Sequence, residues 1–425
     1  MIFMIIKYIF NRNFVLGGYY FLMLSFYLPL KFNSIALIVC GLISLFNINK
    51  STLKEVFIFP LNLFYILFLV LLVGLLYTEN KVTGYAILER HYSLIFVPVI
   101  ASSFSILNTK QQKRILYFFT LVTTVLAFYF LGYAIVDYFN TGSIYIENRS
   151  GHHLYNKFMH HRLTAPLGMH AIYFSLYLSF SFILVLHHFM KYFHSHSILI
   201  KVLFFFLFSF YSLMIILLKS ALFSLALPLA IIILLFFHFG KYAFSKSKYL
   251  IGLISIIIIL SAFSFYGMQS KILNFSTNLN LTEEHPGPLK IRLGVWYSSW
   301  QTIQDNWLLG AGTGDGQDAL VEKYHKLDFY IGKRDQFNAH NMYLQYWISN
   351  GIFAFLLYFL ILILFGLYFL KKKEYVGFLV IFLFASFSFT ESTMLRQSGV
   401  VFFVLFSSLY IFKSSKKNNE NFISS

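Results

Sequence analysis

The side chain best suited to proton transfer in this sequence is a histidine, His340, which is followed by Asn341. Both stand in FNAHNMYLQYWISNG, where a polar segment gives way to a long apolar one, so we expect His340 in the first turn of a helix. The positive end of a helix dipole disfavours imidazolium. A general base must be unprotonated near neutral pH, so this position suits one. The alternative is a structural histidine that only hydrogen-bonds the neighbouring loop.

Four basic residues stand at the edges of apolar segments or on a predicted amphipathic helix: Arg90, Lys219, Arg292 and Arg396. Any one of them is explained equally well as an anchor whose charged end reaches the membrane surface. Several of them on one face would instead form a clamp for a diphosphate, because guanidinium groups match phosphate geometry. Glu391, at the end of an apolar segment, is placed to hold one of them by an ion pair.

A second group of polar residues lies in 139–165, which contains two histidine pairs, His152–His153 and His160–His161. Paired histidines can bind a metal ion, but no cysteine or acid stands beside these to complete a site. We therefore predict no metal centre and no cofactor. We expect this segment to cover the mouth of the site that the basic residues form.

The elements that position these residues must be membrane helices. The chain is 58% hydrophobic and 12% charged, whereas soluble domains average about a quarter charged residues. Apolar runs long enough to cross a bilayer recur throughout, and stretches such as LISIIIILSAFSF lack the alternation of a β-barrel strand. The first run lacks a cleavage site and is expected to be retained. The single cysteine, Cys40, rules out an intramolecular disulfide.

The sequence predicts an all-α integral membrane protein of about twelve transmembrane helices, forming a single polytopic domain over residues 1–425. The expected spans are 13–30, 33–48, 56–77, 92–107, 115–138, 166–188, 199–217, 220–239, 249–268, 342–370, 375–391 and 398–413. One large extracytoplasmic loop, 269–341, separates spans nine and ten.

The distribution of positive charge predicts the orientation. Net charge is +17, but the basic residues lie in short loops between spans, which argues against nucleic acid as a partner. Eighteen of the 33 lysines and arginines fall on the side that holds both termini, which is therefore predicted to be cytoplasmic. Most of the remaining fifteen lie in the two longer loops, 139–165 and 269–341, where we attribute them to an anionic substrate.

The loop 269–341 is long enough to form a structure of its own. Its segment IRLGVWYSSWQTIQDNW is predicted to be an amphipathic helix along the membrane interface, with tryptophans at headgroup depth. GAGTGDG, residues 310–316, fits neither a dinucleotide fingerprint nor a P-loop, and we expect a flexible turn near the site. GQDALVEKYHKL then predicts a second short helix.

The block from residue 291 to 351 resembles the O-antigen ligase and polymerase superfamily. That family has an arginine and a tryptophan on a helix, a glycine-containing turn, the pattern His-Asn-x-(Tyr/Phe)-Leu, and a glycine in the next span. In this sequence the pattern falls on Arg292, Trp296, Gly310, Gly312, Gly314, His340, Asn341, Tyr343, Leu344 and Gly351. LLYTENKVTGYAILERHYSLI and TESTMLRQSGVVFF also look like the corresponding stretches of one branch of that family. The predicted signature region is 291–391.

The resemblance implies a metal-independent, inverting membrane glycosyltransferase of the bacterial inner membrane with its active site in the periplasm. It would move a glycan from an undecaprenyl-diphosphate carrier to lipid A–core oligosaccharide, with His340 and Arg292 catalytic. Arg90, Lys219, Arg396 and Asn341 would bind the diphosphate. Many family members have arginine where this chain has Lys219, which keeps the charge but loses the fork.

Three other functions stay open. A polysaccharide polymerase or a protein O-oligosaccharyltransferase would use the same loop and histidine with a different acceptor. A flippase or transporter is the alternative outside the enzymes. The sequence shows no inverted repeat and no acid in the middle of a span, as a transporter would need.

Overall fold

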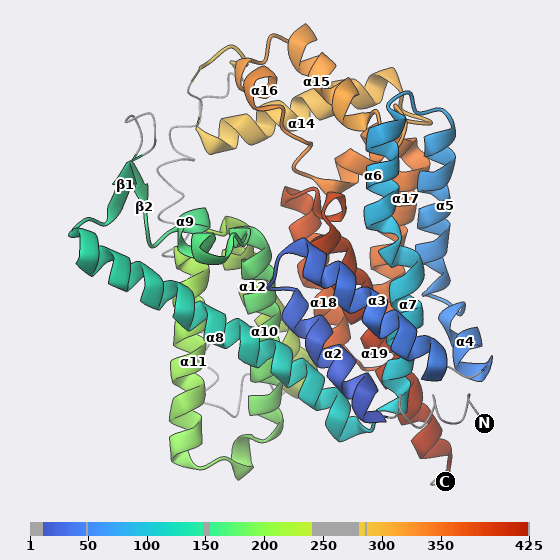
Figure 1. Ribbon diagram of the computed structural model, residues 1–425, viewed down its shortest axis with the longest axis vertical. Coiled ribbons are helices and arrows are strands. Elements are labelled where there is room, and N and C mark those ends of the chain that lie inside the picture. Colours follow the sequence, from blue (N-terminus) through green and yellow to red (C-terminus); the bar gives the residue numbers. More distant parts are fainter. Residues whose placement is uncertain (1–11, 48–49, 148–153, 240–279, 285–286, 424–425) are drawn as a thin grey trace. The chain divides into compact units, whose positions relative to one another are not determined.

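The computed structural model describes residues 12–47, 50–147, 154–239, 280–284 and 287–423. Within these residues the chain is helical apart from one short hairpin, as the composition predicts (Figure 1). It forms two compact units, one of residues 1–47 and 104–265 and the other of residues 48–103 and 266–425. The 3-10 turn η1 (Ser103–Ile106) lies where the chain passes between them.

The first unit is a group of apolar helices around α10. Its helices are α2 (Arg12–Ser25), α3 (Leu30–Asn47), α8 (Thr109–Thr141), α9 (His160–Thr164), α10 (Ala171–Lys191), α11 (Ile198–Leu217) and α12 (Ala221–Phe239), with 3-10 turns η2 (Ala165–Leu167) and η3 (Phe193–Ser195). Helix α10 packs against α8, α11 and α12 and is buried along most of its length. Small hydroxyls make this packing close, since Ser181 Oγ donates to Thr123 Oγ1 at 3.0 Å.

A hairpin interrupts the segment that the sequence suggested was a loop. Strands β1 (Tyr145–Glu147) and β2 (Leu154–Asn156) pair antiparallel, with Tyr145 opposite Asn156. Helix α8 ends just before it at Gly142, whose φ of +66° places it in the left-handed region that favours glycine.

The second unit joins a helical layer to a smaller folded segment. Its long helices are α5 (Asn62–Leu76), α17 (Met342–Lys371), α18 (Tyr375–Thr390) and α19 (Gln397–Ile423), joined by α4 (Lys50–Val56), α6 (Lys81–His91), α7 (Ser93–Ser102) and the 3-10 turn η5 (Thr393–Leu395). Helices α14 (Pro288–Asp305), α15 (Gly316–Lys326) and α16 (Tyr330–Asp335) gather at one end of α5, α6 and α17 (Figure 1).

Eleven of the twelve expected spans coincide with helices, although their bounds differ, and the ninth, 249–268, lies outside the described residues. Five of the described helices are long and apolar enough to cross a membrane: α3, α8, α10, α11 and α17. Four further apolar helices of the described residues are shorter than these five. The protein is therefore a multi-pass helical membrane protein. The number of twelve crossings stays a prediction.

Helix α17 is kinked near its start. Asn350 (φ −129°, ψ 18°) and Gly351 (φ +70°, ψ −170°) leave the helical region, so the first two turns of α17 are set apart from its long apolar part. The six residues before Asn341, together with α14 and α15, pack around these two turns. The kink therefore separates the two turns that follow His340 from the long apolar part of α17.

Candidate functional site

The segment before α17 has a small hydrophobic core of its own. Val295 and Ile303 of α14, Leu320 and Tyr324 of α15, and Ile348 of α17 are at most 2% exposed. The predicted amphipathic helix and the second short helix are thus confirmed as α14 and α15, and α16 was not anticipated. Because α14 packs directly on α17, this core fixes the helix that carries Arg292 against the helix that follows His340.

Three polar side chains hold the backbone leading to His340. Gln317 Nε2 donates to the carbonyls of Gln336 and Phe337 at 2.9 and 3.1 Å. Tyr324 Oη donates to the same Phe337 carbonyl at 3.0 Å, and burial raises the pKa of this tyrosine, which keeps it a donor. Gln345 Oε1 accepts from the Ala339 amide at 3.1 Å. Helices α15 and α17 therefore determine together where His340 stands.

His340 precedes helix α17 instead of occupying its first turn. The helix begins at Met342 with Asn341 as N-cap, and His340 has a φ of +43° in the left-handed region. A non-glycine residue is strained there by about 1–2 kcal/mol, and the bond from its amide to Asn338 Oδ1 at 2.9 Å helps to hold it. The expected position in the first turn is wrong, because a left-handed residue cannot continue into a right-handed helix.

A carboxylate brings His340 and Arg292 together. Glu391, which caps the C-terminus of α18, lies with Oε2 3.4 Å from His340 Nδ1 and with Oε1 3.5 Å from Arg292 Nη2. The side chain of Glu391 is 15% exposed, whereas those of His340 and Arg292 are 27% and 37% exposed. The imidazole and the guanidinium thus stay open to a ligand while one shielded carboxylate holds both.

The carboxylate also determines which imidazole nitrogen is available for chemistry. An ionised Glu391 only accepts hydrogen bonds, so His340 must carry its proton on Nδ1 to bond with it. The opposite nitrogen, Nε2, is then the acceptor. The hydrogen position is assigned from this geometry.

Arg90 and Arg396 lie at a second junction within the same unit. Arg90, near the end of α6, donates through Nη1 to the carbonyl of Leu395 at 3.0 Å. Arg396 follows in the chain, after the 3-10 turn that connects Glu391 to α19, and its side chain is exposed. The segment 391–396 therefore links Arg90 and Arg396 to the carboxylate that holds His340.

Asn341 is a capping residue. It is 5% exposed, and its Oδ1 accepts from the amides of Tyr343 and Leu344 at 3.0 and 3.1 Å. Capping satisfies amides that a helix start leaves without partners. This explains the asparagine without any ligand, and its role in diphosphate binding stays a prediction.

The glycine turn 310–316 is tightly bonded, in contrast to the flexible turn expected. The amides of Ala311 and Gly312 donate to the carbonyls of Ile348 and Ser349, both at 2.8 Å. Thr313 Oγ1 donates to the Leu71 carbonyl and accepts from Asn350 Nδ2, both at 2.7 Å. The turn thereby connects the end of α5 to the kink of α17.

Glycine is required where this turn packs against α17, because main-chain atoms of the two segments lie in direct contact there. A Cβ atom on Gly351 would lie 2.1 Å from the Leu308 carbonyl oxygen, and one on Gly310 would lie 2.5 Å from the Gly351 nitrogen. Asp315 completes the junction, accepting from the Glu79 and Asn80 amides at 2.7 Å each. The turn is thus a joint between α5–α6 and α17, and it holds the first turns of α17 in place.

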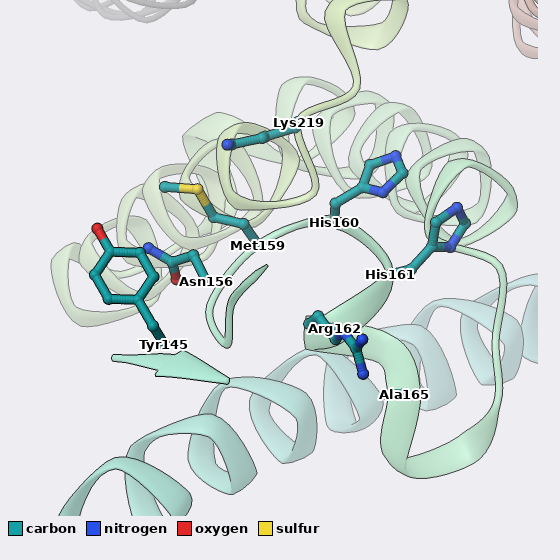
Figure 2. Close-up of a pocket in the computed structure, with 8 residues that line it drawn as sticks. All are labelled: Tyr145, Asn156, Met159, His160, His161, Arg162, Ala165 and Lys219. Atoms are coloured by element: carbon teal, nitrogen blue, oxygen red, sulfur yellow. The ribbon is translucent and has the colours of Figure 1, made fainter. Parts of the chain in front are cut away.

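Lys219 belongs to the first unit, at the break between α11 and α12. It lines a pocket with His160, His161 and Arg162, residues of the segment expected to cover a site (Figure 2). Within the described residues no group of three or more His, Cys, Asp or Glu side chains is arranged to hold a metal ion. His152 and His153 lie outside the described residues, so metal independence stays a prediction.

Several of the residues that position the site were missed in the sequence. Gln317, Tyr324 and Gln345 look like ordinary polar positions on short helices, and Asp315 was noticed only as part of a turn. Their partners are backbone groups as much as 236 residues away, as for Asp315 with Glu79. A pattern of spacing along one segment contains no signal for such bonds.

Fold and geometry together define a multi-pass membrane protein in which a loop-borne histidine, a carboxylate and an arginine meet at the end of the helices. Residues 202–359 match the family model described as O-Antigen ligase. Over these residues the chain is similar to that family, so the resemblance inferred from residues 291–351 is confirmed. The match includes Lys219, Arg292 and His340, whereas Arg90, Glu391 and Arg396 lie outside it. No protein with a curated description matches the chain.

Proposed function

We propose that the protein is a membrane glycosyltransferase that moves a glycan from undecaprenyl diphosphate to a hydroxyl of lipid A–core oligosaccharide. The observation that carries this proposal is the placement of Arg292 and His340 on one carboxylate, Glu391, within a chain whose residues 202–359 match the O-antigen ligase family model. Arg292, a cation for the leaving diphosphate, lies beside one oxygen of the Glu391 carboxylate, and His340, a base for the acceptor, lies beside the other.

In the proposed reaction His340 Nε2 removes the proton of the acceptor hydroxyl as its oxygen attacks the anomeric carbon. The bond from that carbon to the diphosphate breaks, the configuration inverts, and the electron pair leaves on the diphosphate. Glu391 stabilises the imidazolium that forms, and Arg292 stabilises the charge that develops on the leaving group. Arg90 and Arg396 complete the clamp, whereas a phosphate role for Lys219, which belongs to the first unit, stays a prediction. No metal is required for these steps.

The proposed location is the bacterial inner membrane, with both termini cytoplasmic and the site periplasmic. The loop of α14, α15 and α16 and the basic turn at Lys371–Lys373 stand at opposite ends of α17. The part of α17 after its kink runs from Ile352 to Lys371, and at about 1.5 Å per residue it is about as long as a hydrocarbon core of about 30 Å is thick. The basic turn then marks the cytoplasmic side.

The test is transfer of labelled glycan from undecaprenyl diphosphate to acceptor in proteoliposomes. His340→Ala should still bind the donor, yet turn over about 100- to 10,000-fold more slowly. A variant that keeps more than about a tenth of wild-type turnover would contradict the base assignment. Wild-type activity should persist with a chelator present, and its loss would show that a metal takes part.

The acceptor is tested in the same assay. Lipid A–core, a second carrier-linked glycan and a protein acceptor distinguish a ligase from a polymerase and from a protein glycosyltransferase. Movement of the carrier-linked glycan across the bilayer without transfer would point to a flippase. We expect transfer to lipid A–core.

A further inference from the structure

The pocket of the first unit has a volume of about 680 Å³. Small-molecule sites typically span about 300–1,000 Å³, so this pocket has room for sugar rings as well as for a phosphate. Its described lining is Tyr145, Asn156, Met159, His160, His161, Arg162, Ala165 and Lys219, none of which is acidic. In Figure 2, Lys219 and Arg162 stand on different sides of the pocket, with Tyr145 and Asn156 beside each other.

The register of the hairpin explains why the ring of Tyr145 and the amide of Asn156 lie on the same side of the pocket. Tyr145 and Asn156 are directly opposite each other in the antiparallel pair, and opposite residues present their side chains on the same face. Asn156 Oδ1 accepts from the Phe158 amide at 2.9 Å, which leaves Nδ2 as the group for a ligand. A tyrosine ring beside an amide donor suits a pyranose, which offers an apolar face and a rim of hydroxyls.

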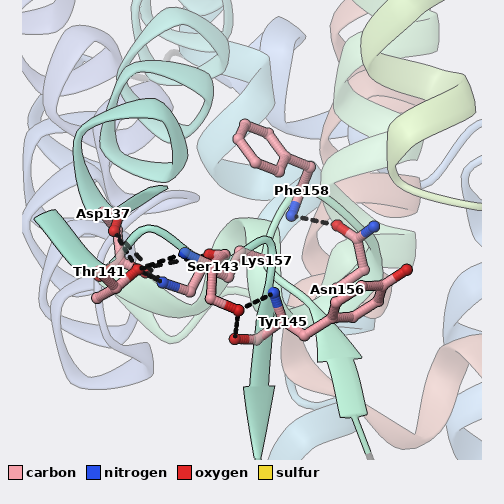
Figure 3. A network of polar contacts seen from close by, with 7 residues as sticks. All are labelled: Asp137, Thr141, Ser143, Tyr145, Asn156, Lys157 and Phe158. Carbon is pink, nitrogen blue, oxygen red and sulfur yellow. Dashed lines mark hydrogen bonds and ion pairs between the residues drawn. The ribbon is translucent and has the colours of Figure 1, made fainter. Parts of the chain in front are cut away.

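An ion pair between a buried lysine and a partly exposed aspartate holds this side of the pocket in place. Lys157 is 5% exposed, its Nζ lies 2.6 Å from Asp137 Oδ2 near the end of α8, and it also donates to Thr141 Oγ1 at 2.5 Å (Figure 3). Because the lysine is buried, loss of the aspartate would leave its charge without a counter-ion, which is costly. The end of β2 is therefore tied to α8, and the hairpin forms a fixed side of the pocket.

The positively charged groups and the imidazoles of the pocket lie on α9 and at the break between α11 and α12, and two of these residues have a left-handed backbone. Lys219 and His160 have φ values of +49° and +53°, and left-handed non-glycine residues gather at functional sites. His161 Nδ1 accepts from the Ala171 amide at 3.3 Å, so its Nε2 carries the proton and is a donor. Arg162 follows on α9, and its side chain is exposed. The pocket thus offers donors and positive charge on the sides facing the tyrosine and the amide.

From this arrangement we propose that the pocket binds an acidic sugar of the donor glycan, with Arg162 on its carboxylate or phosphate substituent and Tyr145 and Asn156 on its ring. The inference rests on the proposed function and makes Arg162 a specificity-determining residue. A carrier diphosphate alone would need the cations but neither the tyrosine ring nor the amide, and it would fill only a small part of the volume.

The test is equilibrium binding to the full-length protein in detergent, with three fluorescent trisaccharides that differ at one sugar. One has a glucuronate, the second a glucose phosphate and the third a neutral glucose at that position. We expect at least one acidic probe to bind about tenfold or more tightly than the neutral one, and the two acidic probes identify the charged group. Arg162→Ala should remove the preference, Arg162→Lys should keep most of it, and the matched control Arg114→Ala on α8 should leave it unchanged.

Three outcomes would overturn the proposal. In the first, the neutral probe binds as tightly as both acidic probes. In the second, Arg162→Ala and Arg114→Ala change the preference for the acidic probes by the same amount. In the third, inorganic pyrophosphate binds in an Arg162-dependent way while neither acidic trisaccharide binds. His340→Ala separates this inference from the proposed function, because it should slow transfer about 100- to 10,000-fold and leave the binding of the acidic probe intact. A wild-type protein that binds the acidic probe but shows no transfer would refute the function and leave the pocket assignment standing.

Discussion

Nδ1 of His340 lies 3.4 Å from Oε2 of Glu391, although 51 residues separate them in the chain. The contact joins the loop before α17 to the end of α18, and it orients the imidazole whose opposite nitrogen would act as base. A histidine held in this way differs from one that merely hydrogen-bonds its own loop. The relationship assigns Glu391 the role of positioning residue.

Glu391→Gln is expected to lower turnover about 10- to 1,000-fold, because the amide keeps the shape of the side chain but cannot stabilise an imidazolium. The effect should appear in kcat with little change in the KM for donor. The measurement is steady-state transfer in proteoliposomes, with Glu283→Gln as control, since Glu283 pairs with Lys290 in the same loop. Equal kcat values for the two variants would count against the positioning role.

Arg292→Ala is expected to lower transfer about 30- to 1,000-fold through the loss of a charge-assisted contact to the diphosphate. Lys326→Ala is the control, because that lysine pairs with Glu322 on the surface of α15 and its side chain is 61% exposed. Lys323 would be a poor control, because its side chain is 12% exposed and lies 2.6 Å from Asp305, so its removal would disturb the fold. Similar activities for the Arg292 and Lys326 variants, at equal protein level, would refute the clamp.

Gly351→Ala is expected to unfold or strongly destabilise the protein, because its Cβ would stand 2.1 Å from a carbonyl oxygen at a φ of +70°. The strain of the backbone alone is about 1–3 kcal/mol. Gly366→Ala in the same helix is the control, since its Cβ would meet only the ring of Phe378 at 3.6 Å. Thermal unfolding in detergent measures both, and a Tm for Gly351→Ala at or above that of the control would contradict the packing described.

Asp315→Asn is expected to cost about 1–3 kcal/mol of stability. The carboxylate accepts from two backbone amides through its two oxygens, and an asparagine can accept with only one of its side-chain atoms. Asp318→Asn, which removes a charge at an exposed position bonded to Asn80 Nδ2, should cost much less. Tm values that fall equally would show that Asp315 contributes only its charge.

Topology fusions test the orientation. Alkaline phosphatase joined after Leu327 should be active, and the same enzyme joined after Lys373 should be inactive, because the two positions lie at opposite ends of α17. Phosphatase is active only outside the cytoplasm. The reverse pattern would place the His340 loop in the cytoplasm and exclude a periplasmic site.

Much of the helical architecture follows from the sequence because its signal is local. Apolar runs in lipid must be helices, since every backbone group needs a partner, and the spans at 199–217 and 342–370 differ from α11 and α17 by one residue at one end. The helical spacing in IRLGVWYSSWQTIQDNW likewise predicts α14. The sequence also indicates His340, Arg292 and Glu391 as polar residues at the edges of helices.

What only the tertiary structure decided is which polar groups meet. The pairing of Glu391 with both His340 and Arg292, the bonding of Asp315 to Glu79 and Asn80, and the hairpin beside Lys219 all join segments distant in the chain. His340 stands outside its helix because Gln345 and Tyr324 hold the preceding backbone, a constraint that no spacing encodes. Local patterns predict helices because each helix satisfies its own backbone, whereas a site depends on contacts that exist only once the helices have packed.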